Sequence, residues 1–319
     1  MAKFNDRRIV IQLINIENKI QVDDNMDDIA HNIHRHAVMA DMMLPGWYDG
    51  WEAIYDAVAV QFAGINDNRH VMKEIYVATD GDMAFILMHI HLEQFYDGAP
   101  RIFAFRQFDT FQKIGERWLC RQAHCFVPIE PDTGNRARGA LPVREEWKWP
   151  TDTLPSAAVS EERAKREIRA WFDARIASDS VDAAMRRIGP REDVIVYAPY
   201  LPGEYRGQQE CRDYYASVFD SVASIEAEVT DYHVATNGLM GAIMSRQNLA
   251  IHMRDSTTRR ISVRQSHGLR RVGDAWQSMI EMTSFPVDLK TGEPVTWIGQ
   301  GAECEIEPDH DTSLSVPAP

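Results

Sequence analysis

The chain has few cysteines, and their spacing fits neither of the frameworks that cysteines commonly build. Its 319 residues include four, at Cys120, Cys125, Cys211 and Cys304. A disulfide-stapled small domain and a structural zinc site both need closer and more regular groups of residues. Free thiols are therefore expected, which is typical of a cytoplasmic protein.

Long apolar runs and an excess of positive charge are also missing. No stretch approaches the roughly 18 apolar residues that a membrane span needs, and Gln12 and Asn15 interrupt the apolar segment Ile9–Ile16. No small-residue cleavage site follows that segment, so a signal peptide is not expected. The formal net charge of −14 has the wrong sign for binding a phosphate backbone or an anionic lipid surface. Neither nucleic acid nor a membrane is an expected partner.

Recognisable cofactor motifs are absent as well. The sequence contains no Gly-rich phosphate-binding loop and no zinc-ligand spacing of Cys and His. We therefore expect a protein that works without a bound cofactor or metal.

What the sequence does contain is an internal repeat. Short segments recur 157 positions apart (201 minus 44), and after one inserted residue the offset becomes 158. The matched segments are Leu44–Gly50 with Leu201–Gly207, Val77–Gly81 with Val234–Gly238, Arg106-Gln107 with Arg264-Gln265, Gly115 with Gly273, and Trp118 with Trp276. Such a colinear series indicates two copies of one domain. The predicted organisation is a first domain at 1–134, a linker at 135–158, a second domain at 159–300 and a disordered tail at 301–319.

Each copy has the pattern of helices followed by long strands. In the second copy apolar residues recur at three- and four-residue spacing from Ile168 to Ile176, and in the first copy from Ile9 to Ile20, which predicts one buried face on each helix. Further helices are predicted at 27–33, 51–62, 181–188 and 208–219. Strands are predicted at 73–79, 83–95, 101–114, 117–129, 226–235, 240–253, 259–272 and 275–287. The expected fold class is α+β, with two tandem cone-shaped domains. Each would be a curved, mostly antiparallel sheet closed by N-terminal helices around a pocket.

One stretch in each copy has a distinctive order, in which a polar strand leads into a Gly turn and a Trp, and a further strand ends before a Pro and a Thr-Gly loop. The second copy supplies Arg264–Trp276, Ser284–Asp288 and Thr291-Gly292, and the first supplies Arg106–Trp118, Pro128–Glu130 and Thr133-Gly134. Together with the order of elements, this stretch resembles the nuclear transport factor 2-like superfamily, in its SnoaL-like branch of polyketide cyclases and ketosteroid isomerase-like proteins. That superfamily holds isomerases, dehydratases, cyclases, other lyases, dioxygenase small subunits and non-catalytic binders, so the resemblance specifies the fold better than the reaction.

The resemblance implies that the catalytic residues lie in the first copy. The branch often has a His on its last strand and an Asp before the Gly turn, which correspond to His124 and Asp109. His89 and His91 add two imidazoles on one face of a strand, and Tyr48 is placed to donate a hydrogen bond to a developing oxyanion. An imidazole and a carboxyl group that face one pocket can divide the roles of base and acid.

Substrate contacts are expected from a further group in the first copy. Its aromatic members favour a flat, apolar substrate. The group consists of Arg106, Trp47, Trp51, Phe105, His36 and Asp41.

Structural roles compete with each of these assignments. His89 and His91 are equally compatible with an interface or with two metal ligands, although a metal site would need more ligands. Tyr48 recurs as Tyr205, which favours a structural anchor, and His124 is compatible with a satisfied core histidine. The second copy has His267 where the first has Asp109 and is either a degenerate copy kept for assembly or a second site.

The function hypothesis is a cofactor-independent lyase or isomerase with dehydratase-like acid-base chemistry. Its substrate would be a small, apolar compound, aromatic or polycyclic, as in the catabolism of aromatic compounds. The first domain would be catalytic and the second supporting. The alternatives are a non-catalytic ligand-binding or assembly module and a small subunit of a larger oxygenase. Homo-oligomer formation stays open, since a tandem chain can also satisfy the usual sheet contact internally.

Overall fold

The computed structural model describes residues 6–22, 29–42, 46–62, 65–96, 99–130, 157–189, 192–201, 203–286 and 295. Most of the predicted linker and the whole predicted tail lie outside these ranges. None of the described helices is long and apolar enough to cross a bilayer.

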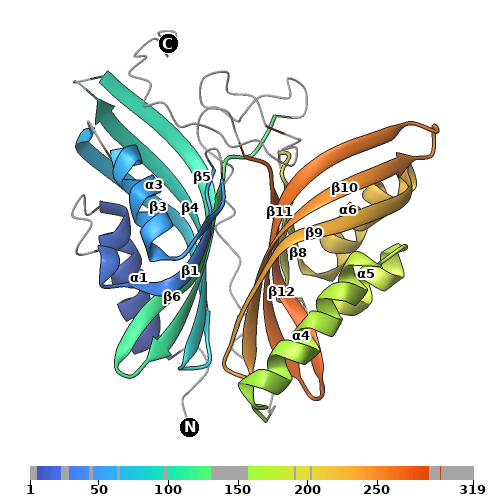
Figure 1. The fold of residues 1–319 in the computed structure, drawn as a ribbon, viewed down its shortest axis with the longest axis horizontal. Coiled ribbons are helices and arrows are strands. Elements are labelled where there is room, and N and C mark those ends of the chain that lie inside the picture. Colours follow the sequence, from blue (N-terminus) through green and yellow to red (C-terminus); the bar gives the residue numbers. More distant parts are fainter. Residues whose placement is uncertain are drawn as a thin grey trace.

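The two units have the same architecture, a six-stranded sheet with helices on one face (Figure 1). The first unit comprises α1 Arg7–Val22, β1 Ile33–Ala40, β2 Tyr48–Asp49, α3 Trp51–Phe62, β3 Ile65–Thr79, β4 Met83–Tyr96, β5 Ala99–Ile114 and β6 Arg117–Phe126. The second comprises α4 Glu161–Ile176, α5 Val181–Ile188, β7 Ile195–Tyr197, β8 Glu204–Arg206, α6 Gly207–Ser221, β9 Val222–Thr236, β10 Met240–Met253, β11 Thr258–Val272 and β12 Ala275–Ser284. The strand orders are β2-β1-β6-β5-β4-β3 and β8-β7-β12-β11-β10-β9. The predicted α+β fold class is confirmed.

Four short strands were not predicted from the sequence. β1 and β7 pair in parallel with β6 and β12, and β2 and β8 extend each sheet by one further antiparallel strand. The helix predicted at 27–33 is wrong at its end, because Ile33 already begins β1, which pairs with Cys120 on β6. A strand whose partner lies so far along the chain has no local pairing signal, and the eight residues of β1 show no strict alternation of apolar and polar side chains.

Local chemistry explains where the helices of the second unit begin. The hydroxyl of Ser160 accepts a hydrogen bond from the backbone N–H of Arg163 at 3.4 Å, and Ser180 does the same for Ala183 at 3.3 Å. Both serines therefore act as N-caps. α4 buries the apolar face predicted from its spacing, and this face packs on the sheet. We call this side of each sheet the helix-covered face.

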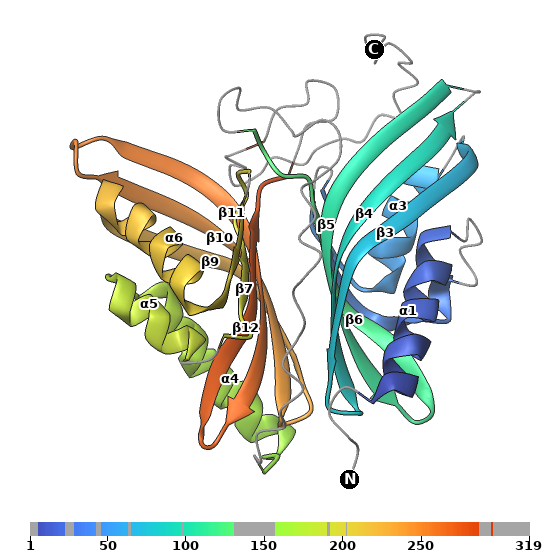
Figure 2. The ribbon, with the colours of Figure 1, turned by 180° about the vertical axis from the view of Figure 1, so that it is seen from behind.

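The opposite faces of the two sheets pack against each other, so that the helices lie on the outside of the molecule (Figures 1 and 2). We call this contact the seam. Its core is apolar and takes side chains from both units, including Phe85, Leu87, Phe108 and Phe126 from the first and Tyr197, Met240, Ala242 and Met282 from the second. Each strand of the central sheet region is thus covered on both faces, which explains why its sequence is largely apolar.

Two matched arginines cross the seam reciprocally. Nη1 of Arg106 donates to the carbonyl oxygen of Gly203 in the second unit at 3.0 Å, and Nη1 of Arg264 donates to the carbonyl oxygen of Gly46 in the first at 3.1 Å. Both guanidinium groups are buried. The recurrence of this arginine and of the Leu-Pro-Gly loop in the sequence therefore reflects one contact made twice, about an approximate twofold axis.

One glycine lets two aromatic rings approach the seam closely. A Cβ atom at Gly268 would lie 3.1 Å from the Phe85 ring and 3.2 Å from the Phe108 ring. The corresponding residue in the first unit is Thr110, whose hydroxyl is buried and has no hydrogen-bond partner within the described ranges. Gly268 therefore permits a close approach of the Phe85 and Phe108 rings to β11.

We expect Gly268→Val to lower the free energy of unfolding by about 1–3 kcal/mol, because the added methyl groups overpack against the two rings. Urea denaturation followed by circular dichroism measures this loss. The matched substitution Thr110→Val in the first unit should change stability by less than about 0.5 kcal/mol, since it removes an unpaired hydroxyl at constant volume. An unaltered urea midpoint for Gly268→Val would contradict this account of the seam.

Candidate functional site

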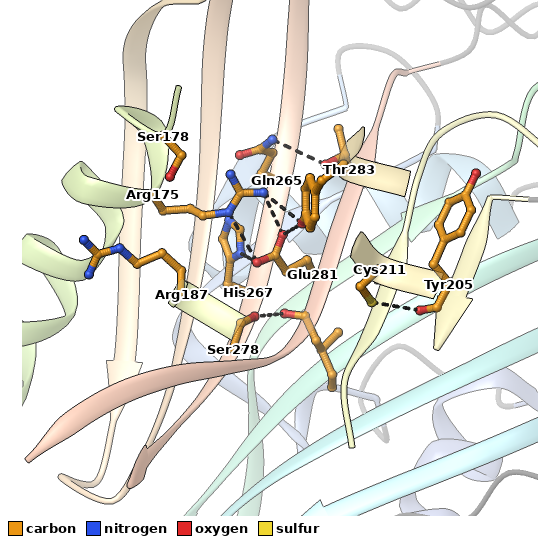
Figure 3. Close-up of polar contacts among 12 residues, drawn as sticks. Arg175, Ser178, Arg187, Tyr205, Cys211, Gln265, His267, Ser278, Glu281 and Thr283 are labelled. Carbon is orange, nitrogen blue, oxygen red and sulfur yellow. Dashed lines mark hydrogen bonds and ion pairs between the residues drawn. The ribbon is translucent and has the colours of Figure 1, made fainter. Parts of the chain in front are cut away.

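Four polar side chains meet on the helix-covered face of the second unit (Figure 3). His267 on β11 and Glu281 on β12 lie directly opposite each other in the strand register. Arg175 reaches them from the last turn of α4, and Tyr215 from α6. The tertiary structure brings together residues that are up to 106 positions apart in the sequence.

Arg175, Glu281 and Tyr215 form a buried ion pair with a shared phenol. Nη2 and Nε of Arg175 donate to the two carboxylate oxygens at 2.9 and 3.4 Å, and the Tyr215 hydroxyl donates to the same carboxylate. Burial alone would raise the pKa of Glu281, but Arg175 and His267 lower it to about 2. Burial raises the pKa of the Tyr215 hydroxyl well above its ordinary value, so this phenol stays neutral. Glu281 is therefore a carboxylate whose charge Arg175 balances.

His267 differs from its neighbours because neither of its ring nitrogens has a hydrogen-bond partner within the described ranges. Its ring lies edge-on to Trp171 and Phe172, with centroids 5.3 and 6.1 Å apart, and only 2% of the residue is exposed. Nδ1 is 3.8 Å from Glu281 Oε1, which is beyond hydrogen-bond range. Burial lowers the pKa of His267 to about 4, although Glu281 opposes this shift. A neutral imidazole with two unpaired nitrogens is rare in a protein interior and points to a ligand-binding role.

The first unit has a different set of side chains at the matched positions. Asp109 replaces His267 and Ala123 replaces Glu281, each 158 residues earlier, and Glu17 of α1 lies next to Asp109. Asp109 and Glu17 are both buried, and the nearness of the two carboxyl groups favours a proton on one of them. Burial raises the pKa of Asp109 to about 6, although hydrogen bonds with Glu17 and Gln107 oppose the shift. The first unit therefore holds an acid pair and lacks the imidazole and the guanidinium.

The predicted catalytic residues of the first unit divide between the two faces of its sheet. Asp109 and Tyr48 lie on the helix-covered side, where Tyr48 packs beneath α3. His124 and His89 lie on the seam, and His91 shares the strand face of His89. Because successive strand residues point to opposite faces, His124 and Asp109 do not meet in one pocket.

Both seam histidines have hydrogen-bond partners in the second unit. The two ring nitrogens of His124 lie 2.6 and 2.7 Å from the hydroxyls of Ser266 and Ser284. Nε2 of His89 lies 3.1 Å from the Tyr197 hydroxyl. Burial lowers the pKa of both histidines, to about 3 for His89 and well below the ordinary value for His124. These neutral imidazoles hold the two units together.

The predicted substrate-contacting residues are equally dispersed. Phe105 and Trp51 lie on the helix-covered side. Arg106 and Trp47 lie at the seam, where Trp47 packs on Met244. His36 is exposed on β1, and Asp41 is buried and raises the pKa of Arg264 against the larger effect of burial.

One group of potential metal ligands lies at the seam. Ligand atoms of Glu74, His89 and Glu204 all lie within 4.8 Å of one another. Glu74 has a left-handed backbone conformation (φ 49°) at a bulge in β3, and its carboxylate approaches Nδ1 of His89 at 3.1 Å. Arg206 forms ion pairs with both carboxylates, and Arg106 lies 3.9 Å from Glu204. Two guanidinium groups thus balance the two carboxylates, so we interpret the group as an ion-pair network that fixes the seam.

Arg175, Tyr215 and Glu281 were not among the site residues predicted from the sequence. The sequence nevertheless contains a pattern that could have indicated Glu281 and Arg175. Glu281 is a single acid within the apolar strand segment Met279–Met282, and Arg175 is four residues after Trp171 on the buried stripe of α4. A charge on a buried face usually has a partner. Tyr215 has no comparable signal, because a tyrosine on an amphipathic helix is ordinary.

Comparison with known proteins agrees with this architecture. Residues 166–288 match the family model of the SnoaL-like domain. The second unit is therefore a SnoaL-like domain, as the resemblance predicted, and the first unit repeats its sheet topology. This superfamily includes isomerases and dehydratases. A search of curated proteins found no match.

Several solved structures are similar to the chain at low sequence identity. A nuclear transport factor 2-like protein of unknown function from Pseudomonas putida KT2440 is 15% identical, with 44% of this chain and 99% of that chain covered and a TM-score of 0.40. A nuclear transport factor 2-like superfamily protein from Salmonella enterica serovar Typhimurium LT2 is 13% identical, with 44% and 99% covered and a TM-score of 0.37. A ketosteroid isomerase-like protein from Erwinia carotovora atroseptica is 20% identical, with 40% and 97% covered and a TM-score of 0.33.

The buried ion pair yields a stability prediction. Arg175→Met should lower the free energy of unfolding by about 3–5 kcal/mol at pH 7, because it leaves Glu281 as an uncompensated buried charge. Arg175→Met combined with Glu281→Leu should recover most of this loss, because neither charge then remains. Urea denaturation of the single and double variants measures the coupling. Equal stability of the two variants would show that Glu281 does not depend on Arg175.

The acid pair of the first unit yields a prediction of pH dependence. The pKa of Asp109 is about 6 in the folded protein against an ordinary 3.8, so the folded state retains a proton that the unfolded state loses. This contribution to stability is present below pH 3.8 and is lost as the pH rises through 6. Asp109→Asn should therefore gain stability relative to the wild type by about 1–3 kcal/mol between pH 4 and pH 7.5. Parallel urea titrations at the two pH values measure the difference, and a pH-independent difference would contradict it.

Proposed function

We propose that the second domain is the catalytic half of a cofactor-independent lyase or isomerase, and that His267 is its base. The observation that carries the proposal is a buried, neutral imidazole with two unpaired ring nitrogens beside a carboxylate. Proton transfer at carbon needs a base of this kind held away from water. The substrate we propose is a small aromatic or polycyclic compound, because aromatic rings border His267.

The geometry gives each residue a distinct task. His267 would accept a proton from a carbon next to a carbonyl group, or next to a carbon that carries a hydroxyl. The resulting imidazolium would lie 3.8 Å from Glu281, whose negative charge stabilises it. Arg175 keeps Glu281 ionised and fixes its position through two hydrogen bonds. In an elimination His267 would return the proton to the departing hydroxyl, so that water leaves and no cofactor is consumed.

The contrast between the units supports the assignment to the second domain, the reverse of the expectation from sequence. The first unit has Asp109 at the position of His267, with the carboxyl group of Glu17 beside it. Its histidines at the seam are already hydrogen-bonded to the second unit. The proposed role of the first unit is therefore to support the second, since its sheet packs against the catalytic sheet at the seam.

The test uses 5-nitrobenzisoxazole, a neutral aromatic probe from which a base removes a ring proton while the N–O bond breaks to give a coloured phenolate. We expect the wild-type protein to accelerate this reaction and His267→Ala to lower kcat/KM by about 100-fold or more. Absorbance of the phenolate follows the rate. The control is His252→Ala, which removes an exposed histidine of the same domain.

The pH dependence provides a second readout of the same experiment. Because burial lowers the pKa of His267 to about 4, the rate should fall only as the pH drops toward 4 and not near 6.5. Glu281→Gln should lower the rate at pH 7 and move this acid limb to still lower pH, since Glu281 raises the pKa of His267. Full activity of His267→Ala, or no acceleration by the wild type, would contradict the proposed function.

A further inference from the structure

A band of hydrogen-bonding side chains lies on the helix-covered face of the second sheet, next to His267. Ser245, Gln265 and Thr283 occupy one row across β10, β11 and β12, and Gln247 lies two residues further along β10. Nε2 of Gln247 donates to Ser245 Oγ at 2.9 Å and to Gln265 Oε1 at 2.8 Å. Gln265 in turn donates to Thr283 Oγ1 at 3.3 Å (Figure 3). We call these four residues the polar band.

The first unit shows that the fold does not require a polar band. At the matched register positions it has Met88, Ile90, Gln107 and Cys125. Met88 and Ile90 are fully buried and belong to the apolar core beneath α1. Burial of a polar side chain costs free energy unless it is hydrogen-bonded, so an apolar row is the simpler way to pack this face. The second unit nevertheless buries Ser245 and Gln247 almost completely.

The polar band retains hydrogen-bonding capacity after its internal contacts are made. The hydroxyls of Ser245 and Thr283 accept hydrogen bonds from the glutamines, which leaves their own O–H groups as donors. Gln247 uses both of its amide N–H groups within the band, whereas Gln265 uses one of its two. Hydroxyl and carbonyl oxygens are the ligand groups that such a mixed set of neutral donors and acceptors recognises.

The charge balance of the site restricts the ligand further. Arg175 is paired with Glu281 through two hydrogen bonds, and the polar band carries no charge. Within the described ranges, neither the polar band nor the balanced Arg175–Glu281 pair offers an unbalanced positive charge to an anionic substrate.

We infer that the polar band is a binding subsite for a second oxygen-containing group of an uncharged substrate. This inference rests on the proposed function, because it places the reacting carbon at His267. Gln265 and His267 are two residues apart on one strand, so the second oxygen would lie about 7 Å from the carbon that exchanges its proton. The substrate class is thus an uncharged aromatic or polycyclic molecule with a hydroxyl or carbonyl group at each end.

The experiment measures the binding of two matched probes by isothermal titration calorimetry. 2-Naphthol has one hydroxyl group, and 2,6-dihydroxynaphthalene has a second one at the opposite end of the same ring system. We expect the wild type to bind the dihydroxy probe about tenfold more tightly, which corresponds to one or two additional hydrogen bonds. The anionic 6-hydroxy-2-naphthoate should bind more weakly than the dihydroxy probe.

One test variant transfers residues of the first unit into the second, and another removes the amide of Gln265. The triple variant Ser245→Met, Gln247→Ile, Thr283→Cys should reduce the preference for the dihydroxy probe to about twofold or less, and so should the single variant Gln265→Met. Circular dichroism establishes that each variant is folded. The matched control is Gln107→Met in the first unit, which should leave the preference unchanged.

The outcomes separate this inference from the proposed function. Equal affinity of the wild type for both naphthols, including no measurable binding of either, would overturn the subsite, as would an undiminished preference in both variants or tighter binding of the carboxylate. The expected preference combined with an inactive wild type in the benzisoxazole assay would support the subsite and refute the catalytic role of His267. Loss of the preference in Gln107→Met alone would place the subsite in the first unit and overturn the inference.

Discussion

The seam imposes the constraint on which the other features of the molecule depend. Each sheet has one face against the other sheet and one face against its own helices, so the central strands have no solvent-exposed side. A polar residue on these strands must therefore find a partner either across the seam or on the helix-covered face. Arg106 and Arg264 find theirs in the loops of the opposite unit, and His124 in two serines. Once these partners are assigned, His267 stands out as a buried side chain whose ring nitrogens have none within the described ranges.

The duplication allowed the two helix-covered faces to differ while the seam stayed matched. The scaffold residues recur in both units because each contact at the seam is made twice. The faces beneath the helices make no such reciprocal contacts, so their residues were free to diverge. One face now carries an imidazole, an ion pair and a polar band, and the other an acid pair within an apolar core. The helix-covered face of the second unit is the better equipped for proton transfer, because its ion pair is balanced in charge and lies next to His267, a base without a hydrogen-bond partner within the described ranges.

The elements with strong local periodicity were predictable almost to the residue. The helix at 51–62 and the strand at 240–253 have the predicted bounds, because their hydrophobic patterns end at clear turn residues. β1 and β7 were missed because their partners in the sheet lie far away along the chain. The candidate site was predictable only in part. Aligning the repeats pairs Asp109 with His267 and so locates a position on the sheet where the two units differ. Arg175 lies on a helix, and an alignment of the strands does not reveal how that helix is oriented on the sheet.

The sequence by itself determined the repeat, the α+β fold class and the scaffold residues, because periodicity and turn chemistry act between near neighbours along the chain. Only the tertiary structure decided which face of the sheet each strand residue occupies. When both faces are buried, apolar and polar residues do not alternate in a way that identifies the faces, and a bulge shifts the alternation by one residue. That decision moved His89 and His124 to the seam and left Asp109 on the other side of the sheet. It also brought Arg175 and Tyr215 to Glu281, beside His267, and so placed the candidate site in the second domain.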